Sequence, residues 1–233
     1  MRTELGVWNV LPNQDSALPL SDYFDFVYID LEHGFRSIDD LSTTIKFYNL
    51  KKTNYSVRVR NFNDPLIQTL LDLGVRNFVL PQIRIFNEIE IFKSKISFPP
   101  LGLRGFHPRS NLKTNAPKSE DVSLTIIIET LEALELLNEI AGDPMVSELY
   151  LGVFDLSMEL GINEGAFSEK LDDYFLQIKT VCEKHNKKFV AMLPTGEDLS
   201  FAYRHGLDKV VVGIDSSLMN QYYEDLIVNL RRE

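Results

Sequence analysis

Eight short apolar runs, separated by longer segments of helical periodicity, constrain the fold of this chain more than any other feature of its sequence. The runs lie at residues 5–10, 25–30, 55–60, 77–81, 123–128, 148–153, 188–193 and 209–214. Because strands that are apolar on nearly every residue are buried on both faces, the pattern predicts a parallel sheet covered by helices. Eight such units in 233 residues match the count and size of a TIM barrel. We therefore predict an α/β fold, with a single (β/α)8 barrel domain over residues 1–233.

The segments between the runs show the spacing of amphipathic helices. Five residues of the segment 64–74 share one apolar face: Leu66, Ile67, Leu70, Leu71 and Leu73. Gly74 follows them, where a helix is expected to end. Further helices are predicted at 37–50, 130–142, 171–185 and 216–233. A doubly wound open sheet is the main alternative, but the chain reads WNVLPNQ after its first run, where that fold places a glycine-rich phosphate turn.

Composition narrows the classes of function. A net charge of -10, with no basic stripe to offset it, argues against a nucleic-acid partner. The single cysteine, Cys182, excludes an internal disulfide framework and a multi-cysteine metal site, and it fits a reducing compartment. The first residues do not resemble a signal peptide, and no stretch approaches the roughly 18 apolar residues of a membrane helix. We therefore expect a cytoplasmic protein with no membrane partner.

Polar residues follow several of the predicted strands. The active site of a barrel lies at the carboxyl ends of its strands, so residues at these positions are candidates for chemistry. They are Asp30, Glu32, His33, Arg58, Arg60, Gln82, Glu129, Asp155 and Asp215. The opposite strand ends hold mostly cap and turn residues such as Gly206 and Asp208. The asymmetry indicates one functional rim.

Glu129 and Asp155 follow neighbouring strands, so their carboxylates are expected to point at one spot. Two close carboxylates repel each other unless a cation lies between them. With oxygen ligands only, the pair favours a hard divalent ion such as Mg²⁺ or Mn²⁺ that keeps open positions for a chelating substrate. The alternative is structural, with Glu129 as a helix first-turn acid and Asp155 as a loop cap.

The segment 98–118 interrupts the alternation of strands and helices. It contains four prolines and two glycines and shows little periodicity, so it is predicted to be a long loop. Long ordered loops in compact domains are often functional.

Several motifs together resemble the HpcH/HpaI aldolase family. The motifs are FDFVYIDLEHG, SVRVRNFNDPLIQTLLDLGVRNFVLPQI, LGLRG, IIIETLEALELLNEI and LYLGVFDLSMELG, in that order and spacing. The family consists of class II, metal-dependent pyruvate aldolases that act on 4-hydroxy-2-oxo acids, with citrate lyase β subunits as relatives. The resemblance implies a TIM barrel that splits or joins a 2-oxo acid and an aldehyde. It also implies a divalent metal, Mg²⁺ or Mn²⁺ with Co²⁺ as a further candidate, and a homo-oligomer, either a trimer or a hexamer.

The resemblance also implies roles for individual residues. His33 matches the catalytic histidine, which works with a carboxylate matching Asp72. Arg58 matches the arginine that steadies the enolate oxygen, with Arg60 as an outside candidate because the motif is one residue longer than usual. Glu129 and Asp155 match the two metal ligands.

Further residues are expected around this centre. Gly152, Phe154 and Asp155 lie where backbone amides of the family hold the pyruvate carboxylate. Gln82 and Arg104 are additional candidates for substrate binding. Asp30 and Glu32 are interpreted as acids that orient metal-bound water or His33.

The chain departs from the family pattern at two places, which leaves other functions open. Val153 and the bulky Phe154 stand where proline and a small residue are usual, and His107 and Arg109 stand where smaller residues are common. One alternative is a citrate-lyase-like carbon–carbon lyase or ligase acting on an acyl-CoA or on oxaloacetate. Its candidate basic residues are Arg84, Arg104 and Arg109. The other alternative is a degenerate, non-catalytic barrel.

Overall fold

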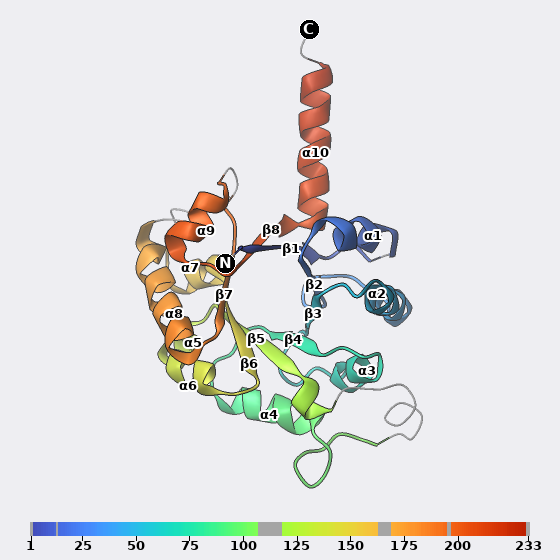
Figure 1. Ribbon diagram of the computed structural model, residues 1–233, viewed down its shortest axis with the longest axis vertical. Coiled ribbons are helices and arrows are strands. Elements are labelled where there is room, and N and C mark those ends of the chain that lie inside the picture. The colour runs from blue at the N-terminus through green and yellow to red at the C-terminus, as the bar shows by residue number, and fades with distance from the viewer. Residues whose placement is uncertain (1, 13, 107–117, 163–168, 195–196, 232–233) are drawn as a thin grey trace.

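A closed barrel of eight parallel strands forms the centre of the computed structural model, which describes residues 2–12, 14–106, 118–162, 169–194 and 197–231 (Figure 1). The strands follow one another around the barrel in chain order. They are β1 (Glu4–Asn9), β2 (Phe26–Asp30), β3 (Tyr55–Arg58), β4 (Asn77–Leu80), β5 (Ser123–Ile128), β6 (Val146–Leu151), β7 (Lys188–Met192) and β8 (Lys209–Ile214). The predicted (β/α)8 barrel is confirmed, and each predicted run overlaps one strand.

Helices surround most of the barrel (Figure 1). They are α1 (Gln14–Tyr23), α2 (Ile38–Lys51), α3 (Ile67–Asp72), α4 (Asn87–Ile96), α5 (Leu131–Glu135), α6 (Leu137–Gly142), α7 (Val153–Glu159), α8 (Asp172–His185), α9 (Leu199–His205) and α10 (Asp215–Leu230), with the short 3₁₀ turns η2 (Ser119–Asp121) and η3 (Glu169–Leu171). The single helix predicted at 130–142 is wrong in one respect. It is divided into α5 and α6 because Leu136 adopts φ -87° and ψ 3°, outside the helical region.

Local signals explain where the helices begin and end. The Ser37 side chain accepts a hydrogen bond from the Asp40 N–H, which caps the start of α2. Gly74, predicted to end a helix, adopts a positive φ of 96° two residues after α3. The part of the predicted loop that the structure describes, residues 98–106, contains turns without regular helix or strand, while His107 and Arg109 lie outside the described residues.

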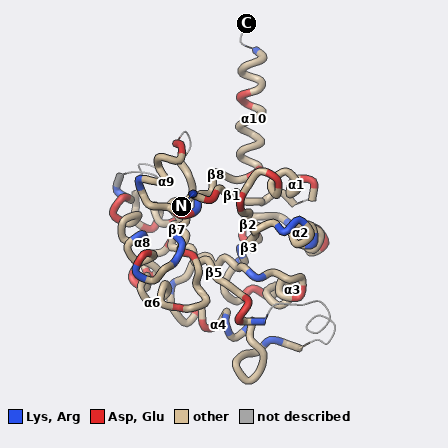
Figure 2. Tube along the Cα trace, in the orientation of Figure 1, with Lys and Arg blue, Asp and Glu red and all other residues tan. Residues whose placement is uncertain are grey.

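Charged side chains are distributed over most of the outer helices, with both signs interspersed (Figure 2). Helix α10 differs, because most of its length carries no charged side chain. Within the described residues, no helix is both long and apolar enough to cross a membrane.

The barrel interior is filled by aromatic rings below the carboxyl-terminal rim. The Trp8 ring centroid lies 4.8 Å from that of Tyr28 and 5.8 Å from that of Tyr150. Closer to the amino-terminal ends of the strands, Lys209 Nζ lies 2.8 Å from Glu148 Oε1, and the Tyr28 hydroxyl donates to the other Glu148 oxygen at 3.0 Å. These buried groups fill the barrel below the rim and separate the rim from the amino-terminal ends of the strands.

Asp215 fastens the closure between the last strand and the first. Its carboxylate accepts hydrogen bonds from the Asn9 Nδ2 at 2.6 Å and from the backbone N–H groups of Val10 and Leu11 at 3.1 and 3.2 Å. The residue is 5% exposed. Asp215, a polar residue at the predicted rim, therefore acts in the structure as a link between β8 and the chain after β1.

We expect Asp215→Ala to lower the free energy of unfolding by about 3 kcal/mol, because it leaves three donors without their charged acceptor. Urea unfolding followed by circular dichroism measures the change. Asp173→Ala, at an exposed position near the start of α8, is the matched control and should change stability far less. Equal unfolding midpoints for the two variants would contradict the role of Asp215.

Candidate active site

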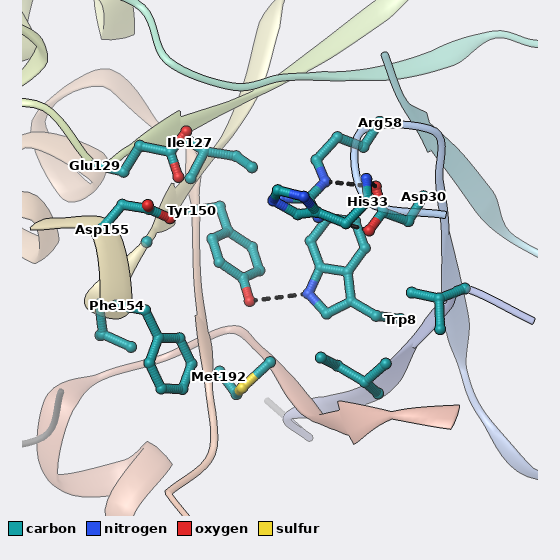
Figure 3. A pocket seen from close by; sticks show the side chains of 14 residues that line it. Trp8, Asp30, His33, Arg58, Ile127, Glu129, Tyr150, Phe154, Asp155 and Met192 are labelled. Carbon is teal, nitrogen blue, oxygen red and sulfur yellow. Dashed lines mark hydrogen bonds and ion pairs between the residues drawn. The ribbon is translucent and has the colours of Figure 1, made fainter. Parts of the chain in front are cut away.

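A pocket opens at the carboxyl-terminal rim of the barrel and encloses about 250 Å³ (Figure 3). Its walls come from strands β1, β2, β3, β5, β6, β7 and β8 and from the first turn of α7. Seven residues predicted for the site line it together: Asp30, His33, Arg58, Glu129, Gly152, Phe154 and Asp155. The parallel strands bring these residues, which are up to 125 positions apart (155 − 30), to one place.

Arg58 is held by three neighbours in a fixed orientation. Its Nε and Nη2 donate to the two Asp30 oxygens at 2.9 and 2.6 Å, and its Nη1 lies 2.9 Å from Glu32 Oε2. The guanidinium carbon lies 4.4 Å from the centroid of the Trp8 ring. A bidentate pair of this kind, with a ring beneath it, restricts rotation of the guanidinium group. Arg58 is therefore preorganised at the pocket wall.

Asp30 also shapes the turn that carries His33. Its Oδ1 accepts hydrogen bonds from the backbone N–H of Glu32 at 2.9 Å and from that of His33 at 3.3 Å. A Cβ atom at Gly34 would collide with the Asp30 carbonyl oxygen, so only glycine permits this tight path. Asp30 was predicted to orient metal-bound water or His33, and in the structure it contacts His33 through the backbone.

The His33 side chain lies at the mouth of the pocket and is 70% exposed. Its Nε2 lies 4.0 Å from Glu32 Oε2, within reach of an ion pair when the imidazole is protonated. Burial raises the pKa of Glu32, while the charges of Arg58 and His33 oppose the rise. The imidazole can exchange protons with solvent while it faces the pocket.

Glu129 is buried at the end of β5, with only 2% of its surface exposed. Its Oε1 accepts the Gln82 N–H at 2.7 Å, an amide that the positive φ of 54° at Gln82 turns toward it. Gln82 does not line the pocket, and its backbone N–H supports Glu129. Its predicted contact with substrate stays a prediction.

Burial raises the pKa of Glu129 to about 7. The hydrogen bond from Gln82 opposes this rise, and the nearby carboxylates of Asp155 and Glu32 add to it. The pKa of Glu129 is thus raised because a buried acid lies beside further acids, and the positive charge of Arg58 partly compensates.

The residues present fit a divalent cation between Glu129 and Asp155. Both carboxylates line the same pocket, and their mutual repulsion contributes to the raised pKa of Glu129. Oxygen donors suit a hard ion such as Mg²⁺ or Mn²⁺. Among the residues that the structure describes, no group of three or more His, Cys, Asp or Glu side chains gathers as a metal cage. A metal held by this pair alone keeps positions for water and for substrate oxygens.

Gly152 allows Glu129 to occupy its position. A Cβ atom at Gly152 would lie 2.7 Å from Glu129 Cβ and 2.9 Å from Glu129 Oε2, closer than packed atoms allow. The Gly152 N–H donates to the Ile128 carbonyl at 3.0 Å, so this amide is engaged in the strand ladder. In the structure, Gly152 therefore contributes the space that its missing side chain leaves, and its predicted contact with a substrate carboxylate stays a prediction.

Two predicted residues lie away from the pocket. Asp72 lies at the end of α3 and accepts a hydrogen bond from Arg104 Nη2 at 3.3 Å. Arg104 is 2% exposed, and its guanidinium carbon lies 4.8 Å from the centroid of the Phe98 ring. Neither residue lines the pocket. Within one chain, the structure therefore does not bring Asp72 to His33 or Arg104 to the pocket. The loop after α4 instead brings Arg104 to Asp72.

Arg60, the outside candidate for the arginine role, does not line this pocket. Its Nε and Nη2 both lie 2.8 Å from Asp64 oxygens, and its side chain is 47% exposed. Phe154 does line the pocket, as predicted, and is 54% exposed at its mouth.

Six pocket residues escaped the sequence analysis: Trp8, Val10, Ile127, Tyr150, Met192 and Ile214. They lie within or at the end of apolar runs, where an aromatic or aliphatic side chain gives no chemical signal. Their common property is that they point into the barrel, and this follows from alternation along the strand only once the strand's inner face is known.

Comparison with known proteins gives an independent result. Residues 6–220 match the sequence model of the family described as HpcH/HpaI aldolase/citrate lyase. The chain is 26% identical over 225 residues to a 5-keto-4-deoxy-D-glucarate aldolase of Escherichia coli, covering 92% of this chain and 87% of the relative. It is 33% identical over 166 residues to a 2-dehydro-3,6-dideoxy-6-sulfogluconate aldolase of Pseudomonas putida, covering 67% of this chain and 65% of the relative.

A solved structure supports the same fold. The crystal structure of the citrate synthase SbnG superposes with a TM-score of 0.85 at 23% identity, over 99% of this chain and 94% of the other. At this identity the likeness concerns the fold alone.

Glu129 should link the stability of the metal-free protein to pH. Because its pKa is raised from 4.5 to about 7, the folded state keeps a proton that the unfolded state releases between these values. The contribution of Glu129 to stability is therefore greatest below about pH 4.5 and falls by about 3 kcal/mol as the pH rises to about 7. Urea unfolding with a chelator, at several pH values in this window, measures the slope. Glu129→Gln removes the titrating group and should flatten this part of the profile; an unchanged slope in the variant would assign the effect to other groups.

Proposed function

From the premise that this chain belongs to the HpcH/HpaI aldolase/citrate lyase family, we propose that it is a metal-dependent aldolase acting on a 4-hydroxy-2-oxo acid. It is a carbon–carbon lyase, as its named relatives are aldolases. The proposed reaction breaks or forms the bond between C3 and C4. Cleavage gives an aldehyde and pyruvate or a similar 2-oxo acid, and the reverse reaction joins these two compounds. The supporting observation is that Glu129, Asp155, Arg58 and His33 converge on one pocket.

Glu129 and Asp155 would hold the metal, Mg²⁺ or Mn²⁺ with Co²⁺ as a third candidate. When bound, the ion supplies Lewis-acid stabilisation of the negative charge that develops on the 2-oxo acid. The chain's part is to keep both carboxylates at one side of the pocket, with Gln82 fixing Glu129 and Gly152 leaving room for it.

Arg58 would stabilise the enolate oxygen at C2. Its guanidinium is fixed by Asp30, Glu32 and Trp8 before substrate arrives, so it does not need to reorient as charge develops. Preorganised positive charge of this kind is among the larger contributions to catalysis.

His33 would act as the general base. In the direction of cleavage its imidazole takes the proton of the C4 hydroxyl, the C4–O bond becomes the aldehyde carbonyl, and the electrons of the C3–C4 bond form the enolate. A proton delivered to C3 then gives the 2-oxo acid. The exposed position of His33 lets it return its own proton to solvent between turnovers.

The two alternative functions receive less support. A CoA-binding site would use basic residues at the rim, but Arg84 pairs with Glu132 and Glu159, and Arg104 is buried beside Asp72. Arg109 lies outside the described residues. A non-catalytic barrel does not account for a buried acid with a raised pKa in the pocket.

Glu129→Gln should lower kcat/KM on the order of 10³-fold, because it removes one of the two proposed charged metal ligands from the pocket. The assay measures pyruvate released from 4-hydroxy-2-oxopentanoate in the presence of Mn²⁺ or Mg²⁺, and calorimetry measures Mn²⁺ binding. Glu132→Gln, an exposed glutamate outside the pocket, is the matched control and should keep full activity. Full activity in Glu129→Gln would overturn the assignment of the metal site.

We further propose that a cytoplasmic homo-oligomer, built from chains that each form one barrel domain over residues 1–233, is the working form. Helix α10 supports this proposal, because it extends away from the barrel in Figure 1. Strand β8 ends at Ile214 and α10 begins at Asp215, which leaves no loop residue to turn the helix back along the strand.

One face of α10 is apolar and exposed. Its residues recur at helical spacing and are between 39% and 69% exposed: Met219, Tyr222, Tyr223, Leu226 and Leu230. At the base of the helix, an apolar groove of about 790 Å³ runs between α10 and residues of α1 such as Pro19 and Leu20. A second copy of the chain would cover the apolar face of α10 and the groove. Each copy would place its own α10 in the groove of the other copy. A trimer of such pairs would be the hexamer expected from the resemblance.

Leu226→Glu should dissociate this assembly, since it places a charge on the apolar face. Light scattering coupled to size exclusion should give a multiple of 26.8 kDa for the native chain and a smaller mass for the variant. Gln221→Glu, a polar position on the opposite side of the same helix, is the control and should leave the mass unchanged. A native mass of one chain would contradict the proposal.

A further inference from the structure

The pocket is divided into a polar half and an apolar half. The polar half consists of Arg58 and His33 with the carboxylates Glu129 and Asp155. The apolar half comes from the chain after β1, from the ends of β7 and β8, and from α7. Its residues are Val10, Met192, Ile214, Val153 and Phe154. Figure 3 shows Phe154 and Met192 beside each other, away from Arg58 and Asp30.

The proposed reaction assigns a part of the substrate to each half. The carboxylate, the C2 oxygen and the C4 hydroxyl need the cation site, Arg58 and His33, so they occupy the polar half. The group beyond C4, which leaves as the aldehyde, is then left with the apolar half. This step rests on the proposed function.

We propose that the aldehyde partner is short and aliphatic, and that Phe154 and Met192 determine this specificity. The preferred substrate then carries a small alkyl group on C4 and no second carboxylate, sulfonate or phosphate. It differs in this respect from the glucarate and sulfogluconate named for the two reported relatives, and it agrees with the 4-hydroxy-2-oxovalerate named for a relative of Rhodococcus jostii that is 26% identical over 94% of this chain.

The charges around the pocket support this choice. Among the described residues that line it, the basic side chains are Arg58 and His33. Arg58 is already engaged by Asp30 and Glu32, and His33 is assigned to proton transfer. A second anionic group on the substrate would lie against Met192, Ile214 and Phe154, which offer no hydrogen-bond donor. Burying an unpaired charge is strongly unfavourable.

The size of the pocket supports it as well. A volume of about 250 Å³ lies below the usual range of roughly 300–1,000 Å³ for small-molecule pockets, so the substrate must be compact. The 2-oxo acid half takes part of this space. Phe154, bulky and at the mouth, narrows what remains for the aldehyde.

The test compares kcat/KM for cleavage of two substrates that differ only beyond C4: 4-hydroxy-2-oxopentanoate, with a methyl group, and 4-hydroxy-2-oxopentanedioate, with a carboxylate. The native protein with Mn²⁺ should prefer the methyl compound by about 100-fold. Met192→Lys places a cation in the apolar half, and should reduce or reverse this preference. Phe154→Ala should raise kcat/KM for substrates with a longer alkyl chain relative to the methyl compound, because it widens the mouth.

Met158→Lys is the matched control, because Met158 lies on α7 outside the pocket and is 80% exposed. It should keep the native preference. A native preference for the carboxylated substrate, or a preference that Met192→Lys and Met158→Lys change equally, would overturn the inference.

Deuterium exchange at the methyl group of pyruvate separates this inference from the proposed function, since exchange requires the polar half and no aldehyde. Deuterium exchange together with a preference for the carboxylated substrate would support the proposed aldolase function and would overturn the inference of an aliphatic aldehyde. If the protein shows neither exchange nor cleavage with Mn²⁺ or Mg²⁺, the proposed function fails and the inference fails with it.

Discussion

Closure of the barrel between β1 and β8 is the constraint on which the rest of the structure depends. All eight strands run in the same direction, so closure gathers their carboxyl ends into one ring. It brings Trp8, on the first strand, opposite Glu129, after the fifth, and places Met192 and Ile214 between them. Asp215 holds the closure through the backbone that follows β1, at the same rim that carries the site. Stability and site geometry therefore depend on the same few contacts.

The distribution of buried charge separates structure from chemistry within the barrel. Glu148 is paired with Lys209 below, and Asp30 is paired with Arg58 at the rim. Glu129 has a backbone amide for one oxygen and another carboxylate nearby, so burial raises its pKa to about 7. A folded protein tolerates such an imbalance mainly where function requires it. The imbalance is the physical reason for proposing that Glu129 and Asp155 would hold a cation there, beside Arg58 and His33.

Several site residues could be predicted from sequence because each lies near the carboxyl end of an apolar run or just after it. Asp30, His33, Arg58, Glu129 and Asp155 all line one pocket, since the end of a strand is a local property and the barrel brings all such ends together. Asp72, Arg104 and Gln82 could not be placed in the same way. Asp72 meets Arg104 through a loop distant in sequence, and Gln82 acts through its backbone N–H, which residue type does not reveal. The division of the helix at Leu136 also had no signal in the apolar pattern.

The sequence by itself determined the eight-stranded barrel, the rim at which its polar residues gather and the family to which the chain belongs. It could do so because the alternation of apolar runs with helical segments, the length of each run and the residues at its end are all properties of residues near one another in the sequence. Only the tertiary structure decided that Asp30 serves Arg58 and the backbone before His33, that Gly152 makes room for Glu129, and that Met192 and Phe154 form one wall. It also decided that α10 leaves the barrel, because its direction depends on the absence of a connecting loop after β8. These features arise from contacts between distant segments, for which the side-chain type alone gives no information.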